Sequence, residues 1–202
     1  SERCIRDGSN GAGGDAAALF FGGAITGNSA GLGGGLALQG GAYVDVFATL
    51  IADNAASEFG GGVIAISDGA GASGQLIVIN ATIANNFGGK GGGAIGVGAG
   101  VNSILLQSIV TGNDAVAGAG LMIIDEDALF AANEGLPPPA FIDCGTIDSG
   151  QSIVAGNGAS PAREITTHDP SRVLINGAGA VIGDRLFNLS TLSAADPAIV
   201  TW

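Results

Sequence analysis

The sequence is poor in positive charge and in the side chains that usually bind nucleic acids, metals and sugars. Its 202 residues hold 6 Lys and Arg against 18 Asp and Glu, for a net charge of −12, and only one His, one Trp and one Tyr. This balance argues against binding to nucleic acid or to anionic membranes, because both carry negative charge. No apolar run approaches the ~20 residues that span a bilayer, so we expect no transmembrane helix.

Cysteine is also scarce, and the two that are present leave two interpretations open. Cys4 and Cys144 are candidates for one disulfide between the N-terminal segment and a later insertion, as in an extracellular protein. The alternative is a pair of buried free thiols. A site built from His and Cys ligands is not expected, because His168 is the only histidine and there is no Cys-x-x-Cys motif.

One short pattern recurs five times: an apolar β-branched residue, any residue, then Gly, Asp or Asn, and finally Asn. The copies are Ile25-Thr26-Gly27-Asn28, Ile51-Ala52-Asp53-Asn54, Ile83-Ala84-Asn85-Asn86, Val110-Thr111-Gly112-Asn113 and Val154-Ala155-Gly156-Asn157. Their final asparagines are 26 (54−28), 32 (86−54), 27 (113−86) and 44 (157−113) residues apart.

Glycine clusters recur at nearly the same intervals as this pattern. They are Gly33-Gly34-Gly35, Gly60-Gly61-Gly62, Gly91-Gly92-Gly93 and Gly118-Ala119-Gly120. Their last residues are 27 (62−35), 31 (93−62) and 27 (120−93) residues apart. Two markers with matching steps indicate one supersecondary unit that is repeated and stacked.

Short apolar runs follow each glycine cluster and recur after the next loop. The runs cover residues 36–38, 63–66, 94–97 and 121–124, and then 44–47, 76–79 and 104–106. Alternate residues such as Ile64 and Ile66 would share one face of a strand. No stretch keeps a period of 3.6 residues, so we expect no long amphipathic helix. The sequence therefore predicts an all-β parallel β-helix, with two or three short strands in each rung of about 27 residues.

The repeated asparagines are expected to be structural. Asparagine tolerates the left-handed conformation of a sharp corner, and the same residue in stacked rungs can form a hydrogen-bonded ladder. The corner residues are Asn28, Asn54, Asn86, Asn113 and Asn157. A β-sandwich with glycine-rich turns is the alternative fold, and a flexible glycine-rich chain is disfavoured because 47% of the residues are hydrophobic.

The chain is expected to form a single domain over residues 1–202. The longest step holds a loop insertion around residues 125–150, after which Ser152–Asn157 restores the pattern. Insertions in a solenoid map to loops on one face. The chain begins at Ser1 without a methionine or a secretory leader, which fits either a processed mature protein or an excised fragment.

The repeats resemble those of secreted bacterial right-handed β-helix proteins, including the polymorphic outer-membrane protein type. Gly22-Gly23-Ala24-Ile25 and Gly92-Gly93-Ala94-Ile95 match the Gly-Gly-Ala-Ile motif of that family. Its Phe-x-x-Asn motif is carried here with Ile or Val in place of Phe. The resemblance covers roughly residues 11 to 184 and implies a right-handed parallel β-helix at the cell surface or outside the cell. It implies a structural or adhesive role, although some related β-helices are polysaccharide lyases.

Catalytic groups are sparse, so we expect no enzymatic activity, and a polysaccharide lyase or hydrolase is the alternative. Such an enzyme needs carboxylates, a basic residue and aromatic side chains that stack on sugars. Lys90 lies inside a glycine corner, where a solvated turn explains it. No cofactor is expected apart from calcium, for which Asp125, Glu126 and Asp127 are candidate ligands and a solvated acidic loop is the alternative.

The ends of the solenoid are the expected sites of contact with partners. The sequence shows no amphipathic helix that would cap the strand edges at either end. We expect the chain to associate end to end with itself, as a filament, or with other cell-surface components. The candidate contact residues are Phe20, Phe21, Ile199 and Trp202. The alternative is that the chain is a fragment whose caps lie outside it.

Overall fold

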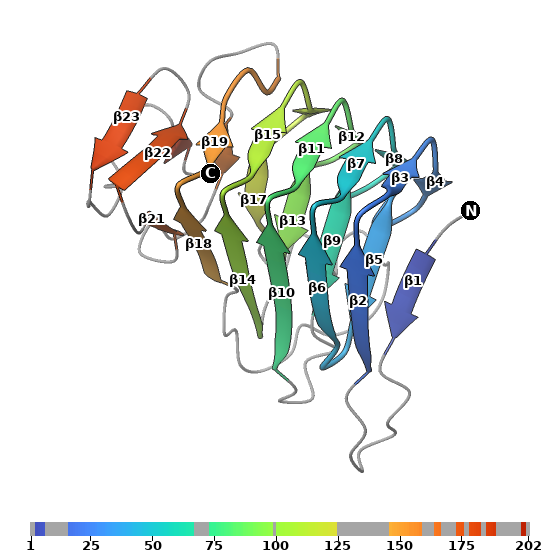
Figure 1. The fold of residues 1–202 in the computed structure, drawn as a ribbon. Helices are drawn as coiled ribbons and strands as arrows, with labels where there is room; N and C mark the ends of the chain where they lie inside the picture. The colour runs from blue at the N-terminus through green and yellow to red at the C-terminus, as the bar shows by residue number, and fades with distance from the viewer. Residues whose placement is uncertain are drawn as a thin grey trace.

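The structure is a computed structural model in which short strands stack side by side along the length of the molecule (Figure 1). It describes the backbone of residues 3–6, 16–66, 73–98, 100–124, 146–158, 164–166, 173–175, 178–182, 185–188 and 199–200. Side-chain burial is described for residues 16–66, 73–98, 100–124, 147, 149–158 and 164–165. None of the described residues lies in a helix, and so none forms a helix long and apolar enough to cross a membrane.

The described strands form four sheets that run along the molecule. Sheet A consists of β1 (Arg3–Arg6), β5 (Leu36–Gln39), β9 (Val63–Ile66), β13 (Ile95–Val97), β17 (Leu121–Ile123), β20 (Ile165–Thr166) and β24 (Ile199–Val200). Sheet B consists of β2 (Ala17–Phe21), β6 (Tyr43–Phe47), β10 (Gly74–Ile79), β14 (Val101–Leu106), β18 (Thr146–Gly150) and β21 (Val173–Ile175). Sheet C consists of β3 (Ala24–Thr26), β7 (Leu50–Ala52), β11 (Thr82–Ala84), β15 (Ile109–Thr111), β19 (Ile153–Val154), β22 (Ala178–Ile182) and β23 (Arg185–Asn188). Sheet D consists of β4 (Ser29–Ala30), β8 (Ala55–Ala56), β12 (Phe87–Gly88) and β16 (Asp114–Ala115).

Parallel pairing connects equivalent residues of successive repeats. In sheet C, Ile25 pairs with Ile51, Ile51 with Ile83, Ile83 with Val110, and Val110 with Val154. Among the described strands, only β23 runs antiparallel to its neighbour, β22, at the edge of sheet C. The predicted all-β class and parallel strand arrangement are confirmed, and both are those of a parallel β-solenoid.

Each complete repeat contains four strands rather than the two or three that the sequence predicted. One such repeat runs through β5, β6, β7 and β8, and the next through β9, β10, β11 and β12. The strands of sheet D have only two residues each, too few to produce an alternating pattern in the sequence. They are fixed by bonds between repeats, such as the backbone N–H of Phe87, which donates to the carbonyl of Asn54 at 2.8 Å.

The loop insertion predicted around residues 125–150 overlaps a strand at its C-terminal end. Thr146–Gly150 forms β18, which pairs in parallel with β14 and places Asp148 beside Ile104. The sequence does not predict this strand, because its buried positions include Ser149 rather than a second large apolar residue. Residues 125–145 lie outside the part of the chain that the structure describes.

The main core fills the space between sheets A, B and C. Side chains along each strand of sheet B point alternately inward and outward. Val44 and Val46 point inward and are almost completely buried, as are Leu76 and Val78 in the next repeat. Sheet C contributes one inward residue per strand, such as Ile51 or Ile83. Successive repeats therefore add equivalent layers to one continuous apolar core.

Sheet A is buried on both faces, which explains its unbroken apolar runs. Val63 and Ala65 point into the main core, whereas Ile64 belongs to a second cluster with Ala37, Phe59, Met122 and Ile124. Gly96 completes this cluster by its lack of a side chain. A Cβ atom there would lie 2.8 Å from Cδ1 of Ile124 and 2.9 Å from Cδ1 of Ile64.

Two buried hydroxyls stand out in the described part of the core. The Oγ atoms of Ser103 and Ser149 are buried without a hydrogen-bond partner. We predict that Ser149→Ala raises the free energy of unfolding by about 1 kcal/mol, since an unsatisfied buried hydroxyl costs about 1–3 kcal/mol. Ser108→Ala is the matched control and should lower stability, because the Ser108 hydroxyl both donates and accepts. Thermal melts of the parent, Ser149→Ala and Ser108→Ala measure these changes, and a loss of stability in Ser149→Ala contradicts the prediction.

Candidate functional site

A sharp corner separates sheet C from sheet D in every repeat, and its left-handed residue is not the predicted one. Positive φ angles of 55–71° belong to the residue before each repeated asparagine: Gly27, Asp53, Asn85, Gly112 and Gly156. The repeat pattern alone had predicted this conformation for the asparagine itself. The third position of the motif is therefore Gly, Asp or Asn for backbone reasons, since these residues best tolerate positive φ.

The repeated asparagines form a continuous ladder inside the protein. The Nδ2 of each donates to Oδ1 of the next, at 2.9 Å for Asn28 to Asn54, for Asn54 to Asn86 and for Asn86 to Asn113, and at 2.8 Å for Asn113 to Asn157. The backbone N–H of each donates to the same oxygen, at 2.9–3.1 Å. Asn54, Asn86, Asn113 and Asn157 are each 1% exposed, so these bonds are shielded from water.

Each ladder asparagine also reaches back to the preceding repeat. Asn86 Nδ2 donates to the carbonyl of Ile51 at 3.0 Å as well as to Asn113 Oδ1. The equivalent backward bonds join Asn54 to Ile25, Asn113 to Ile83 and Asn157 to Val110. One side chain thus connects three successive repeats, and both of its amide hydrogens are used.

The ladder ends on a carboxylate. Glu164 is 3% exposed; its Oε1 accepts from the backbone N–H of Asn157 at 3.2 Å, and its Oε2 accepts from Asn157 Nδ2 at 2.6 Å. A further asparagine would carry two more donors that need acceptors, whereas an ionised carboxylate only accepts. Because both carboxyl oxygens of Glu164 accept hydrogen bonds from Asn157, this residue closes the chain of donors. The repeat pattern does not predict this residue, because it lies only seven positions after Asn157 and outside the repeat motif.

A second ladder, also missed, lies at the corner between sheets B and C. The left-handed residues there are Gly22, Ala48, Asn80, Gln107 and Gln151. The residue that follows carries a buried hydroxyl in three repeats, at Thr49, Ser108 and Ser152. Ser152 Oγ accepts from the backbone N–H of Ser108 at 3.1 Å, and Ser108 Oγ accepts from that of Ala81 at 3.1 Å. The signal in the sequence is a small residue placed five positions before each ladder asparagine.

The glycine corner joins sheet D to sheet A by close backbone contact. A Cβ atom on Gly34 would lie 2.5 Å from the carbonyl oxygens of Ala55 and Gly61 in the next repeat. Lys90 lies in this corner with its side chain 47% exposed, and its Nζ is 3.6 Å from Glu58 Oε1. An exposed pair of this length contributes little to stability.

The candidate contact residues are only partly described. Phe21 is 81% exposed on β2, and Phe20 is half-buried against the main core from the same strand. Ile199 lies in β24 at the opposite end of sheet A, so the structure does not bring it near β2. Trp202 lies outside the described residues.

The remaining candidate sites cannot be built from the described residues. Cys4 lies in β1, but Cys144 is outside the described chain, as are Asp125, Glu126 and Asp127. Within the described ranges, no group of three or more His, Cys, Asp or Glu side chains is placed to hold a metal ion.

Comparisons of the chain with protein-family models, with curated proteins and with solved structures found no match.

We predict that Asn86→Val lowers the free energy of unfolding by about 3 kcal/mol or more. Valine removes the side-chain bonds to Ile51 and Asn113 and leaves the backbone N–H of Asn54 without its buried acceptor. Asn85→Gly is the neighbouring control and should change stability by about 1 kcal/mol or less, because glycine accepts the φ of 55° at that position. Denaturant titrations measure both, and an Asn86→Val variant as stable as the parent contradicts the ladder.

Replacing the carboxylate at the ladder end gives a separate test. We predict that Glu164→Gln costs about 1–3 kcal/mol, because the new amide NH2 faces the donors of Asn157 and one acceptor is lost. Glu58→Gln makes the same chemical change at a partly exposed site and should cost about 0.5 kcal/mol or less. Equal effects of the two substitutions on denaturant midpoints would count against the assigned role of Glu164.

Proposed function

We propose that this chain is a right-handed parallel β-helix that acts as a non-catalytic structural or surface protein and assembles end to end. The observation that carries the proposal is the first repeat, where strands β1 to β4 are the outermost members of their sheets at one end of the molecule (Figure 1). Strand edges of this kind pair readily with another chain.

The right-handed winding follows from the chirality of parallel connections. Crossovers between parallel strands of one sheet are right-handed in about 98% of cases, owing to the twist of the strands. The paired positions in sheet C are 26 and 27 residues apart in two steps, and 32 and 44 residues apart in the others. A basic rung of about 27 residues with lengthened loops in two repeats accounts for these numbers.

Burial along the molecule supports contact through the first repeat. Its inward residues Ala18 and Phe20 are only partly buried, whereas Val44 and Val46, their partners in the second repeat, are at most 1% exposed. A second molecule stacked on this end would cover Phe20 and pair with the outer edge of β2. A head-to-tail contact need not close on itself and so produces filaments.

The place of action that we propose is the cell surface or the extracellular space. The family likeness proposed for it is to β-helix repeats of the polymorphic outer-membrane protein type, supported by the Gly92-Gly93-Ala94-Ile95 motif. In the structure Gly92 takes a φ of 62°, which favours glycine, and Ile95 is 3% exposed, which favours an apolar residue. The two parts of the motif therefore have different structural roles.

We predict that the full-length protein forms longer particles as salt rises, because a net charge of −12 opposes close approach and salt screens it. Light scattering and electron microscopy from about 0.01 M to about 0.5 M salt measure this. Phe20→Asp should prevent this end-to-end growth by placing a charge at the joint. Phe87→Asp, at a 48% exposed site in a central repeat, is the control and should assemble like the parent. A parent chain that is monomeric at every salt concentration overturns end-to-end assembly.

A further inference from the structure

The outer face of sheet B is apolar across four strands, and nothing in the described chain accounts for it. One row along the molecule consists of Phe21, Phe47, Ile79 and Leu106, which are in register on β2, β6, β10 and β14. The adjacent row contains Leu19, Asp45, Ile77 and Ile104. All eight side chains are partly or largely exposed, and the exposure reaches 65% at Leu19 and 81% at Phe21. These two rows form the B face.

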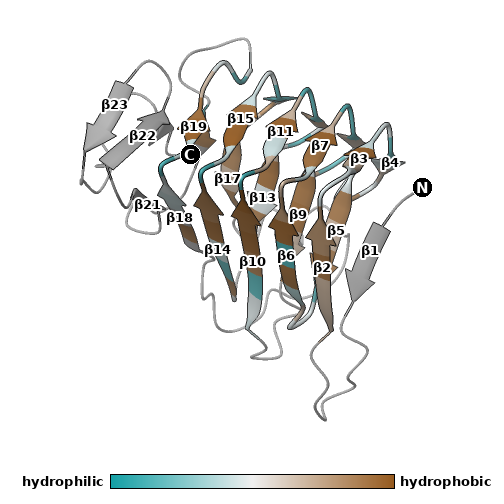
Figure 2. Ribbon diagram, viewed as in Figure 1, coloured by the Kyte–Doolittle hydropathy of each residue, from teal (hydrophilic) through white to brown (hydrophobic). Residues whose placement is uncertain are grey.

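Apolar residues on both sides of a parallel sheet usually mean that both sides are covered. Figure 2 shows β10 and β14 hydrophobic over most of their length rather than alternating with polar residues. The outer face of sheet A is covered by the cluster around Ile64 and Met122. The B face has exposed apolar side chains in the same kind of sheet, and contiguous apolar patches on a monomer mark sites of interaction.

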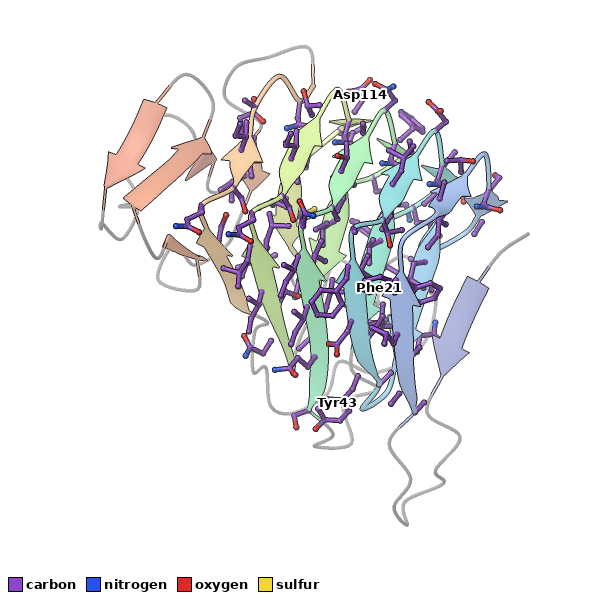
Figure 3. The ribbon with its side chains drawn as sticks, in the orientation of Figure 1. Phe21, Tyr43 and Asp114 are labelled. Carbon is purple, nitrogen blue, oxygen red and sulfur yellow. The ribbon has the colours of Figure 1, made fainter. Side chains whose placement is uncertain are left out.

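Charge identifies the partner. Asp45 is the only charged side chain of the B face, while the whole chain carries a net charge of −12. The exposed carboxylate of Asp114 lies at the opposite, upper edge of the molecule, far from Tyr43 at the lower end of sheet B (Figure 3). With no lysine or arginine and a single carboxylate, the B face offers few ion pairs to a charged partner and suits another apolar surface that is nearly uncharged, such as a second B face. Two copies of this chain repel each other over most of their surface and least where two B faces meet.

The area of the B face limits how tightly two copies can bind through it. Four strands spaced ~4.8 Å apart and five residues of ~3.3 Å each cover about 320 Å² on each copy, or about 640 Å² in total. Stable complexes usually bury about 1,200–2,000 Å², so an isolated pair should be weak and dependent on concentration. The rows run along the solenoid, so end-to-end assembly would multiply the contact and join filaments side by side.

We propose that the B face docks against the B face of a second copy, with the two sheets packed about 10 Å apart as in a β-sandwich. Such a contact is isologous, because a two-fold axis sets the same residues against each other. Its bundling consequence rests on the end-to-end assembly proposed above, whereas the dimer itself does not. The two ideas therefore fail in different experiments.

The test compares two double variants of the full chain by sedimentation equilibrium from about 1 μM to about 1 mM. Ile77→Glu with Ile104→Glu places charge in the middle of the B face, away from the end strand β2. Leu50→Glu with Ile109→Glu is the matched control on the outer face of sheet C, where these side chains are 39% and 41% exposed. Phe20→Asp is added to all three proteins so that end-to-end contacts are blocked.

We expect the parent to dimerise, the sheet C variant to match it, and the B-face variant to raise the dimer dissociation constant at least about tenfold. If the glutamate pair prevents folding, judged by circular dichroism, Ile77→Thr with Ile104→Thr replaces it and should weaken the dimer in the same direction. Equal dissociation constants for the parent and the B-face variant overturn the proposal. A monomeric parent that instead floats with neutral phosphatidylcholine vesicles also overturns it, since the face would then bind lipid.

Discussion

The rest of this structure depends on one constraint: buried backbone and side-chain amide groups must find hydrogen-bond partners in the neighbouring repeats. A solenoid has few contacts between residues distant in sequence except those to the next repeat, so each repeat must be held by its neighbours. The parallel sheets satisfy most backbone groups, but the corners leave the sheets and would bury unpaired donors. The asparagine ladder solves this problem at one corner and the serine and threonine hydroxyls at another. Both ladders are directional, and Glu164 is an acceptor where the first one ends.

The two ladders also determine where the chain tolerates extra residues. The left-handed residues of the two corners are five positions apart in every repeat, as at 48 and 53 or at 107 and 112. From the corner between sheets C and D of one repeat to the corner between sheets B and C of the next, the left-handed residues are 21 (48−27), 27 (80−53), 22 (107−85) and 39 (151−112) positions apart. A residue added between the corners would turn the ladder side chain out of the core, since strand side chains alternate. Variation is therefore confined to the loops on the other side of the solenoid.

The sequence predicts features that are periodic and fails where one residue acts alone. Five asparagines and the glycine clusters recur in phase, which is enough to predict stacked parallel strands. The left-handed position was misassigned by one residue, because Asp53 and Asn54 or Asn85 and Asn86 have similar propensities, and only the structure shows which member points inward. Glu164 occurs once and has no period. The strands of sheet D are fixed by pairing between repeats rather than by their own residues, and Ala81 lacks the hydroxyl that would mark the second ladder in its repeat.

The central claim is that the ladder asparagines are held by cooperative buried hydrogen bonds, and hydrogen exchange of their side-chain amides tests it most directly. With asparagine labelled selectively with ¹⁵N, nuclear magnetic resonance resolves the Nδ2 hydrogens of Asn54, Asn86 and Asn113 from those of the exposed Asn80 and Asn85. The account predicts that the ladder amides exchange only when the protein unfolds globally, and that Asn80 and Asn85 exchange at once. Ladder amides that exchange as fast as the exposed pair would contradict it.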